Sequence, residues 1–461
     1  MSDFPLKSYV DEHKSIHLVG IGGVSMSALA ELLLHLGAKI TGSDRAASPI
    51  TAKLEALGVT ITYAHLPENV AHADLVIRTA AIHDDNPEIV RAQERGIPVI
   101  ERAQAWGSIM RAYRNAVCVA GTHGKTTTTS MLTLVGMQCG VDPTVMVGSH
   151  LPAIGGTLRI GAHDCFIAES CEYTNSFLSF HPTVAVVLNV DADHLDFFKD
   201  IDDIVQSFHR FCALVPETGA LVVNADSPNA LRAVAGIDRT CITFGSSPNA
   251  DVYPANVTDR HGYYSFDVIY HGKTYTHVDL SVPGFHNMLN ALACCAVCIF
   301  LELDPQNAAI GLNQFTGSAR RFQLTGRMPN GAMVIDDYAH HPTEMEATLR
   351  TAQEMDYDRI LCVFQPHTYS RTVALLPEFV HALSLCDKAI LADIYAAREQ
   401  NTFGVSSKDI ADKLEGGEYY DSFDKIAARL REIAQPGDLI LTMGAGNVYE
   451  IGNAIVAPEN L

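Results

Sequence analysis

Short apolar runs alternate with longer amphipathic stretches over the first hundred residues. Five of these runs predict β-strands, because they are rich in β-branched residues and are bounded by polar or glycine-containing turns: IHLVGIG, AKITGSD, VTITYA, DLVIRT and IPVIER. Between the first two runs, residues 25–36 predict a helix, and Gly37 directly after them suits a helix C-cap. Repeated alternation of strands and helices predicts a parallel sheet flanked by helices.

The same alternation occurs twice more. After a polar stretch at residues 108–115, which we interpret as a linker, the predicted strands are AVCVAG, DCFIAES, TVAVVLNV and GALVVNAD. Beyond Ser246, turn signals separate alternating hydrophobic and polar residues, which predicts antiparallel strands, and a helix follows from Pro283. A third set has the strands MVIDDY, RILCVFQ, KAILADIY and DLILTMG, with a helix over 342–355.

These patterns predict an α/β protein with three domains, each built on a mainly parallel sheet flanked by helices. We place the domains at residues 1–108, 109–318 and 319–461. A chain of 461 residues is too long for one ordinary hydrophobic core, which agrees with several domains.

Composition narrows the class of protein. The chain is 48% hydrophobic and 18% charged, which is typical of a folded soluble protein. Its formal net charge of −21 argues against a broad nucleic-acid-binding face, but a small anionic substrate responds to local N–H groups instead. The N-terminus lacks the apolar core of a signal peptide, and residues 289–301 are shorter than the roughly 20 residues that span a bilayer. We expect a cytoplasmic protein that binds neither nucleic acid nor membranes.

The eleven cysteines show no repeated paired spacing. Cys294, Cys295 and Cys298 lie in an apolar helical run with no histidine at ligand spacing. We therefore interpret them as buried, reduced thiols rather than metal ligands, which suits a reducing compartment.

The strongest local motif is AVCVAGTHGKTTTT. A strand ends at Ala120, a glycine-rich turn follows, and a helix begins near Lys125. Such a turn directs backbone N–H groups at phosphate oxygens, while Lys125 faces the β- and γ-phosphates and the Thr126 hydroxyl is placed to ligate Mg²⁺. Val119 stands where the standard loop has its first glycine, so the motif is a shorter variant. The predicted ATP-binding loop is Gly121, Thr122, His123, Gly124, Lys125, Thr126 and Thr127.

Carboxylates and a histidine follow two further predicted strands. Glu169 and Glu172 come at and after DCFIAES, and DADHLD with His194 follows TVAVVLNV. The carboxyl ends of adjacent parallel strands are where α/β enzymes build their sites, and an oxygen-rich set beside a phosphate loop suits Mg²⁺.

The first domain contains a partial dinucleotide-binding fingerprint. Gly20 and Gly22 have the expected spacing, Ser25 occupies the third glycine position, and Asp44 follows where an acidic residue contacts ribose hydroxyls. Alone, this favours an NAD(P)-binding oxidoreductase. That alternative explains neither the phosphate loop nor the third domain.

GTHGKTTTT resembles the ATP loop of the Mur ligases and their folylpolyglutamate-synthetase relatives, and the resemblance extends through all three predicted domains. It implies a Rossmann-like N-terminal domain for a UDP-sugar, a central P-loop ATPase domain and a Rossmann-like C-terminal domain for an amino acid. VIDDYAHHPTE and FQPHTYSRT resemble the members that join L-alanine to UDP-N-acetylmuramate through an acyl phosphate in peptidoglycan precursor synthesis. A murein-peptide ligase is the alternative within the family, and a non-catalytic nucleotide-binding regulator is a further one.

The resemblance implies roles for individual residues. The metal ligands would be Thr126, Glu169 and His194, for two Mg²⁺ ions. The UDP-sugar would contact Gly22, Gly23, Ser25, Asp44, His65, Thr79 and His123. ATP would further contact His286, Asn287 and Asp336. Catalytic roles would fall to Lys125, Glu169, His194, Arg320, Arg321 and His340.

The amino acid would lie among Tyr338, His340 and Arg371, with His340 as one candidate general base. Some family members have a second arginine where this chain has Thr368, which places more weight on Arg371 for binding the carboxylate. Several members also carry a carbamylated lysine in a segment that reads IVQSFHRFCAL here, without any lysine. Asp336 and Asp337 either contact ribose or cap the following helix. We expect a monomer or a homodimer.

Overall fold

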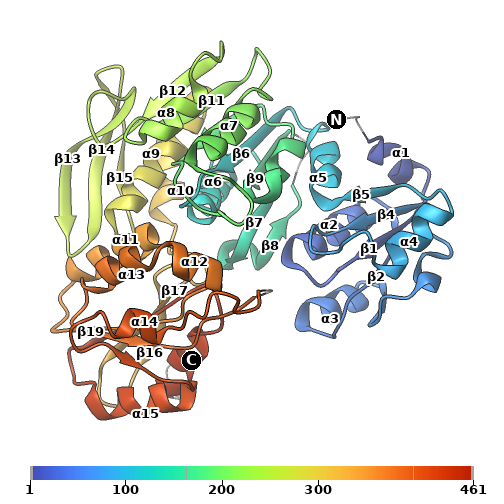
Figure 1. The fold of residues 1–461 in the computed structure, drawn as a ribbon. Coiled ribbons are helices and arrows are strands. Elements are labelled where there is room, and N and C mark those ends of the chain that lie inside the picture. Colours follow the sequence, from blue (N-terminus) through green and yellow to red (C-terminus); the bar gives the residue numbers. More distant parts are fainter. Residues whose placement is uncertain (1–3, 162–163, 398, 458–461) are drawn as a thin grey trace. The chain divides into compact units, whose positions relative to one another are not determined.

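The computed structural model describes residues 4–161, 164–397 and 399–457. Three α/β sheets follow one another along the chain, as predicted (Figure 1). The chain divides into two compact units. The first comprises the described parts of Met1–Val190, with Asp202–Phe244 and Ala293–Gly311, and the second comprises Asp191–Ile201, Gly245–Leu292 and the described part of Leu312–Leu461.

The first unit begins with a five-stranded sheet in the order β3-β2-β1-β4-β5, with all strands parallel. Its strands are β1 (Ser15–Val19), β2 (Lys39–Ser43), β3 (Thr60–Thr62), β4 (Leu75–Arg78) and β5 (Val99–Glu101), which confirms the five predicted ones. The helices are α1 (Leu6–Asp11), α2 (Val24–His35), α3 (Pro49–Ala56), η1 (Pro67–Val70), α4 (Pro87–Glu94) and α5 (Arg102–Met110). Helix α2 ends before Gly37, whose φ of 93° is readily adopted only by glycine.

The predicted linker at 108–115 was wrong for its first three residues, which belong to α5. The helix continues because Trp106, Ile109 and Met110 are buried, and the Trp106 ring packs 5.9 Å from that of Phe166. Burial of these side chains outweighs the polar appearance of the stretch.

The rest of the first unit holds seven strands of the second, ten-stranded sheet, in the order β12-β11-β10-β6-β9-β7-β8. Its strands are β6 (Asn115–Ala120), β7 (Thr144–Leu151), β8 (Gly156–Arg159), β9 (Cys165–Glu169), β10 (Val184–Val187), β11 (Ala220–Asn224) and β12 (Thr240–Phe244). Only β8 runs antiparallel to its neighbour. Around them lie α6 (Lys125–Gln138), η2 (Pro152–Ile154), η3 (Tyr173–Ser179), α7 (Ile201–Cys212), α8 (Pro228–Val234) and α10 (Pro305–Asn313). The sequence did not predict β7, β8 or β12.

Helix α9 (Phe285–Phe300) carries the three cysteines of the apolar run. Cys294, Cys295 and Cys298 are fully buried free thiols, and burial raises the pKa of each, to about 12 for Cys295. The interpretation as buried thiols is confirmed. Over the described ranges, every helix is too short or too polar to cross a membrane.

The second unit contains the antiparallel strands β13 (Val252–Arg260), β14 (Tyr263–Tyr270) and β15 (Lys273–Asp279), as predicted. Its six-stranded sheet has the order β16-β17-β21-β18-β19-β20, with only β16 antiparallel. These strands are β16 (Gln323–Arg327), β17 (Met333–Asp337), β18 (Ile360–Phe364), β19 (Lys388–Leu391), β20 (Glu418–Tyr419) and β21 (Leu439–Met443). The helices are α11 (Pro342–Gln353), α12 (Tyr369–Ala374), α13 (Leu376–Leu383), α14 (Lys408–Ala411), α15 (Phe423–Ile433) and α16 (Tyr449–Ile455).

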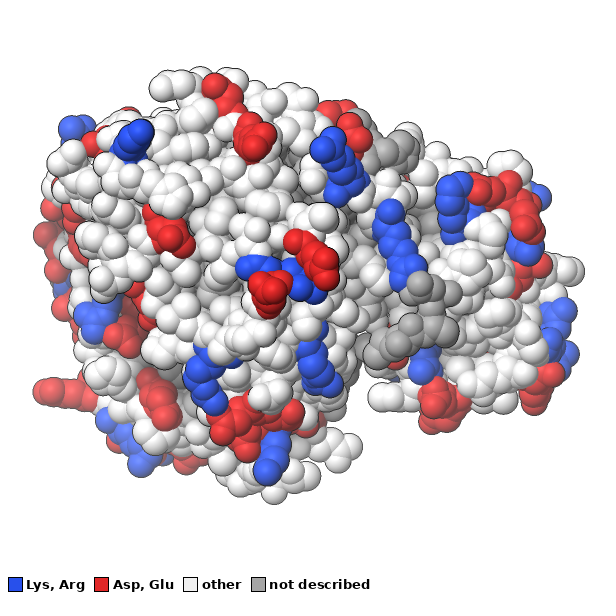
Figure 2. Space-filling view, turned by 90° about the horizontal axis from the view of Figure 1, so that it is seen from above, with Lys and Arg blue, Asp and Glu red and all other residues white. Residues whose placement is uncertain are grey.

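Strand β18 shows why this sheet is covered on both faces. Cys362 and Phe364 belong to a buried cluster with residues of α11 and α13, whereas Leu361 and Val363 belong to one with residues of α15 and α16. Alternate residues of a strand point to opposite faces, so a continuous apolar run such as ILCVF requires helices on both sides. On the face shown in Figure 2, Lys and Arg are interspersed with Asp and Glu.

Candidate active site

The loop between β6 and α6 adopts backbone conformations that favour glycine at two positions. Gly121 has a φ of 146° and Gly124 a φ of 83°, and a Cβ atom on Gly121 would lie 2.9 Å from Cβ of Leu188. Both glycines therefore shape the turn. Helix α6 starts at Lys125, which confirms the predicted start.

Asn189, directly after β10, forms three hydrogen bonds with this loop. Its Oδ1 accepts the N–H of His123 at 2.8 Å, its Nδ2 donates to the His123 carbonyl at 3.1 Å, and its own carbonyl accepts the N–H of Thr122 at 3.2 Å. The amides of Thr122 and His123 are thus engaged within the protein. A phosphate on the loop would instead use the amides that follow them, at the start of α6. Asn189 was not among the predicted residues.

Lys125 folds back into its own loop. Its Nζ atom donates to the carbonyls of Gly121 at 2.5 Å and Thr122 at 3.0 Å, and it lies 3.0 Å from Oε2 of Glu172. Burial opposes the charged form, but the carboxylates of Glu172 and Glu169 outweigh it and raise the pKa of Lys125. The lysine is therefore held fully charged beside the phosphate loop.

Thr126 and Glu169, two of the three predicted metal ligands, are hydrogen-bonded to each other. The Thr126 hydroxyl donates to Oε2 of Glu169 at 2.9 Å, and the same oxygen accepts the N–H of Gly148 at 2.8 Å. One hydroxyl and one carboxylate fit Mg²⁺, which takes few protein ligands and completes its shell with water and phosphate. His194 belongs to the other compact unit. Within the described ranges, His, Cys, Asp and Glu form no group of three that is able to hold a metal.

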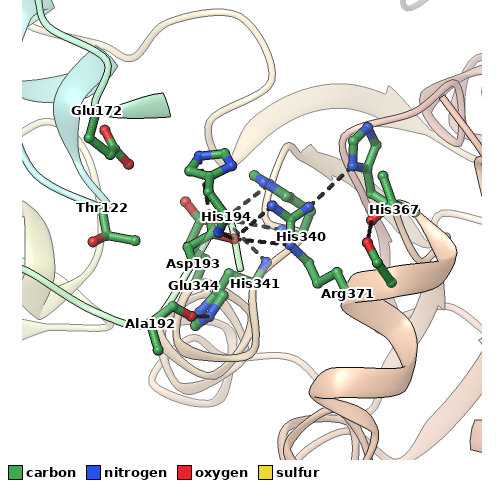
Figure 3. Close-up of polar contacts among 12 residues, drawn as sticks. Thr122, Glu172, Ala192, Asp193, His194, His340, His341, Glu344, His367 and Arg371 are labelled. Carbon is green, nitrogen blue, oxygen red and sulfur yellow. Dashed lines mark hydrogen bonds and ion pairs between the residues drawn. The ribbon is translucent and has the colours of Figure 1, made fainter. Parts of the chain in front are cut away.

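In the second unit, Asp193 lies at the centre of a ring of nitrogen groups (Figure 3). Its Oδ1 accepts from Nη2 of Arg371 at 2.7 Å and from Nε at 3.2 Å, and both side chains are about 10% exposed. Burial would raise the pKa of Asp193, but Arg371 and the histidines His194, His340 and His341 lower it. The carboxylate is therefore ionised and pairs with the guanidinium.

The histidines around Arg371 are ordered by ring contacts and hydrogen bonds. Nδ1 of His367 faces Nη1 of Arg371 at 3.2 Å and so accepts from it, which leaves His367 neutral. Burial, His340 and Arg371 lower the pKa of His367 to about 3. His340 packs edge-on against His367 and Tyr338, with centroids 5.8 and 5.5 Å apart. Its Nδ1 donates to the Tyr338 carbonyl at 3.1 Å and lies 3.2 Å from Oε2 of Glu344, so Nε2 is the acceptor when the ring is neutral.

The Arg320 side chain donates three hydrogen bonds to residues of its own domain. It donates from Nε to Asp336 at 2.9 Å, and from its two terminal nitrogens to the carbonyls of Gly444 at 2.6 Å and Gly446 at 2.9 Å. Its guanidinium also lies over the Tyr338 ring. Such a set of bonds ties the start of the domain to the loop after β21.

Neither Asp336 nor Asp337 caps the helix that follows them, α11. Asp336 accepts from the Thr442 hydroxyl at 2.7 Å as well as from Arg320, while Asp337 accepts the N–H groups of Phe322 and Ala339, each at 2.7 Å. The residue that caps α11 is His341. Burial raises the pKa of Asp337 to about 6, although Arg321 opposes the shift.

His286 and Asn287 open α9, where the resemblance places adenine. Burial, together with the positive charge of Arg321, lowers the pKa of His286 to about 4. Asn287 donates to the Pro283 carbonyl at 2.7 Å and accepts from Asn290 at 3.1 Å. The Asn287 side chain is therefore oriented by the protein.

In the N-terminal domain, Asp44 holds the glycine loop directly. Its Oδ2 accepts the N–H of Gly22 at 2.7 Å, and a Cβ on Gly22 would lie 2.8 Å from that oxygen. A Cβ on Gly20 would likewise lie 2.8 Å from Cγ2 of Thr79. Ser25 accepts from Nε1 of Trp106 at 3.2 Å. Asp44 and Thr79 thus lie against the glycine loop, whereas Gly23 has more room, with its nearest such contact at 3.6 Å.

His65 joins a buried network that the sequence did not predict. Its Nδ1 lies 2.8 Å from Oε2 of Glu88, whose side chain is fully buried. The His65 side chain is 16% exposed, so it is mostly covered rather than a surface residue.

Three family models match this chain in succession. They are described as the Mur ligase family catalytic domain over residues 15–114, the Mur ligase middle domain over 119–298 and the Mur ligase glutamate ligase domain over 320–446. Together they cover most of the chain.

Curated relatives and solved structures agree with these matches. The UDP-N-acetylmuramate–L-alanine ligase of Caldanaerobacter subterraneus subsp. tengcongensis is 48% identical over 96% of this chain and 97% of that protein. That of Acetivibrio thermocellus is 47% identical over 98% and 97%. The crystal structure of the UDP-N-acetylmuramate–alanine ligase from Thermotoga maritima is 29% identical with a TM-score of 0.81, covering 96% and 98% of the two chains. A murein peptide ligase from Psychrobacter arcticus is 25% identical with a TM-score of 0.72, covering 96% and 100%.

Proposed function

This chain belongs to the Mur ligase family, and on that premise we propose that it joins L-alanine to UDP-N-acetylmuramate with hydrolysis of ATP to ADP and phosphate. The observation that carries the proposal is the 48% identity to an enzyme of that name over nearly the whole of both chains. The geometry of the phosphate loop and of the Arg371 cluster supports it. The domains would be residues 1–108 for the UDP-sugar, 109–318 for ATP and 319–461 for the amino acid.

The reaction has to activate a carboxylate, because oxide is too poor a leaving group for an amine to displace. The lactyl carboxylate of the sugar attacks the γ-phosphorus of ATP, which gives an acyl phosphate and ADP. The deprotonated amine of L-alanine then attacks the acyl carbon. The tetrahedral intermediate collapses to the amide and releases phosphate.

Lys125 and the first turn of α6 would stabilise the charge that develops on the transferring phosphoryl group. The lysine has to exchange the Glu172 carboxylate for phosphate oxygens as ATP binds. Arg321 is a candidate for a γ-phosphate contact, and the Arg320 donors are bonded to Asp336, Gly444 and Gly446.

Thr126 and Glu169 would hold Mg²⁺ beside the phosphates, and the ion would add positive charge at the reacting oxygens. In the other unit, Arg371 would bind the alanine carboxylate, and Nε2 of His340 is a candidate to accept the ammonium proton. The UDP-sugar would occupy the loop around Gly22, Gly23 and Ser25, with His123 toward the sugar acid.

The test is phosphate release from ATP and Mg²⁺ with UDP-N-acetylmuramate, in the presence of L-alanine, of L-alanyl-γ-glutamyl peptide, or of neither. Release that depends on L-alanine is the expected result. Release only with the peptide would identify a murein-peptide ligase instead. Folded protein that releases no phosphate in any mixture would contradict both.

A further inference from the structure

Glu88 is a fully buried carboxylate at the N-terminal turn of α4, in the N-terminal domain. Its Oε1 lies 2.6 Å from Nδ2 of Asn69 and 3.3 Å from Nε2 of His17. Its Oε2 lies 2.7 Å from Oγ of Ser43 and 2.8 Å from Nδ1 of His65. Four polar groups thus converge on one carboxylate from β1, β2, the segment after β3 and η1.

The ionised state follows from these neighbours. Burial would raise the pKa of Glu88, but the hydrogen bonds from His17, Asn69, Ser43 and His65 outweigh it and lower the pKa. The positive end of the α4 dipole favours the same state.

An ionised carboxylate only accepts hydrogen bonds, so each of its four partners has to donate. Nδ1 of His65 therefore carries a proton. In the neutral imidazole the other nitrogen, Nε2, is then an acceptor. The Nδ1 atom faces a fully buried group, and 16% of the His65 side chain is exposed.

We propose that Glu88 is a positioning residue of the UDP-sugar site, which fixes His65 in the Nδ1–H tautomer so that Nε2 accepts a hydrogen bond from the uridine. This inference rests on the proposed function and on the place of His65 in it. The uridine offers two sources of such a donor, the N3–H of uracil and the hydroxyls of ribose.

His17 contacts the other oxygen of the Glu88 carboxylate. It is 1% exposed, and its Nε2 donates to Glu88. Its Nδ1 lies 2.8 Å from the Thr41 hydroxyl and accepts a hydrogen bond from it. His17 therefore holds Oε1 of Glu88, while His65 contacts Oε2. A carboxylate that orients an imidazole in this way acts on ligands through the ring.

The first measurement is the dissociation constant of UDP-N-acetylmuramate for the full chain and three variants. Glu88→Gln places an amide among four donors and releases the tautomer, so we expect affinity to fall about tenfold, as for one lost hydrogen bond. In a His65→Ala background the same change should have no further effect, because the ring through which it acts is gone. Additive losses in the double variant would overturn the proposal.

Asn69→Ala is the matched control for a purely structural role. It removes one donor from Oε1, the Glu88 oxygen that does not hold His65, together with the hydrogen bond from Asn69 to the Ala64 carbonyl. We expect its melting temperature to fall in the same way as that of Glu88→Gln, with the affinity for UDP-N-acetylmuramate unchanged. An equal loss of affinity in both variants would show that the network only stabilises the domain.

The tautomer can also be observed without any substitution. In ¹⁵N-histidine spectra of the wild-type protein, His65 should show a protonated Nδ1 and an unprotonated Nε2, and the Nε2–H tautomer would overturn the proposal. Competition by CDP and by 2′-deoxy- and 3′-deoxy-UDP then locates the donor. Weaker competition by CDP identifies uracil N3–H, weaker competition by a deoxy analogue identifies a ribose hydroxyl, and equal competition by all would contradict recognition through an acceptor. A wild-type protein that binds no UDP would contradict the proposed function itself.

Discussion

The Nη2 atom of Arg371 lies 2.7 Å from Oδ1 of Asp193, and the two residues are separated by 178 positions in the chain. The pair is nearly buried, so the guanidinium is already oriented before an amino acid arrives. The same nitrogens are those that a bound carboxylate would use. Asp193 thus occupies part of the edge of Arg371 that we assign to L-alanine.

Arg371→Lys should raise the KM for L-alanine strongly. Lysine keeps the charge but loses the planar fork that holds two carboxylates in fixed geometry, so we expect an increase of about 10- to 100-fold, equal to about 1.4–3 kcal/mol. Steady-state kinetics with varied L-alanine measure this. The KM for UDP-N-acetylmuramate serves as the control, and a parallel rise in both constants would argue against an amino-acid role.

Lys125→Ala should reduce phosphate release by at least about a thousandfold while UDP-sugar binding stays near normal. It should also destabilise the protein, because Glu172 is buried and loses its cationic neighbour, at a cost of about 3 kcal/mol. Adding Glu172→Gln should restore much of the stability without restoring turnover. Loss of UDP-sugar binding in Lys125→Ala would contradict the division of ligands between the domains.

Asn189→Ala should weaken ATP binding through the phosphate loop. The side chain makes both hydrogen bonds to the His123 backbone, so their loss frees the loop, and we expect the KM for ATP to rise about tenfold. Asn224→Ala is the matched control, because Asn224 donates to the Leu188 carbonyl, outside the loop. Equal effects of the two substitutions would show that Asn189 acts only through general stability.

The two arginines at the start of the third domain should separate stability from activity. Arg320→Ala removes bonds to Asp336 and two carbonyls, and we expect it to lower the free energy of unfolding by about 3 kcal/mol. Arg321→Ala should lower kcat with a smaller effect on unfolding. Denaturant titration and phosphate release, measured on both variants, test the distinction, and the reverse pattern would exchange the two assignments.

His286 should make the protein less stable in mild acid. Its pKa is about 4 in the folded state and near 6.5 when unfolded, so the unfolded chain takes up a proton first as the pH falls. Stability is then complete above pH 6.5 and is lost as the pH falls from about 6.5 to 4, by at most about 3 kcal/mol. His286→Gln should flatten the pH dependence of unfolding by denaturant over that range. An unchanged slope would mean that this imidazole does not titrate as the structure indicates.

Local pattern was enough to predict most strands of the three sheets and the phosphate loop. Strands such as ILCVF are continuous apolar runs, and the glycine turn before Lys125 lies within a few residues of sequence. Strands β7 and β12 were missed, because residues 144–151 and 240–244 mix polar and apolar positions and become strands only through pairing with their neighbours.

The polar contacts of the site were harder to predict, because they join residues that are distant in the chain. Glu88 meets His17 across 71 positions, and Asn189 meets His123 across 66. Neither pair has a spacing or a motif that points to it. Carboxylates and amides are also common at helix starts and strand ends, so their types alone do not identify the partner.

The buried thiols of α9 can be used to measure local opening of the structure around this helix. Cys294, Cys295 and Cys298 are fully covered, and a thiol reacts with an alkylating reagent only when it is reached and deprotonated. Their rate of labelling in the native protein therefore measures how often this part of the chain opens, much as hydrogen exchange does for amides. Ligands that stabilise the surrounding unit should slow that labelling as their occupancy rises. The labelling rate of these three cysteines therefore reports ligand binding.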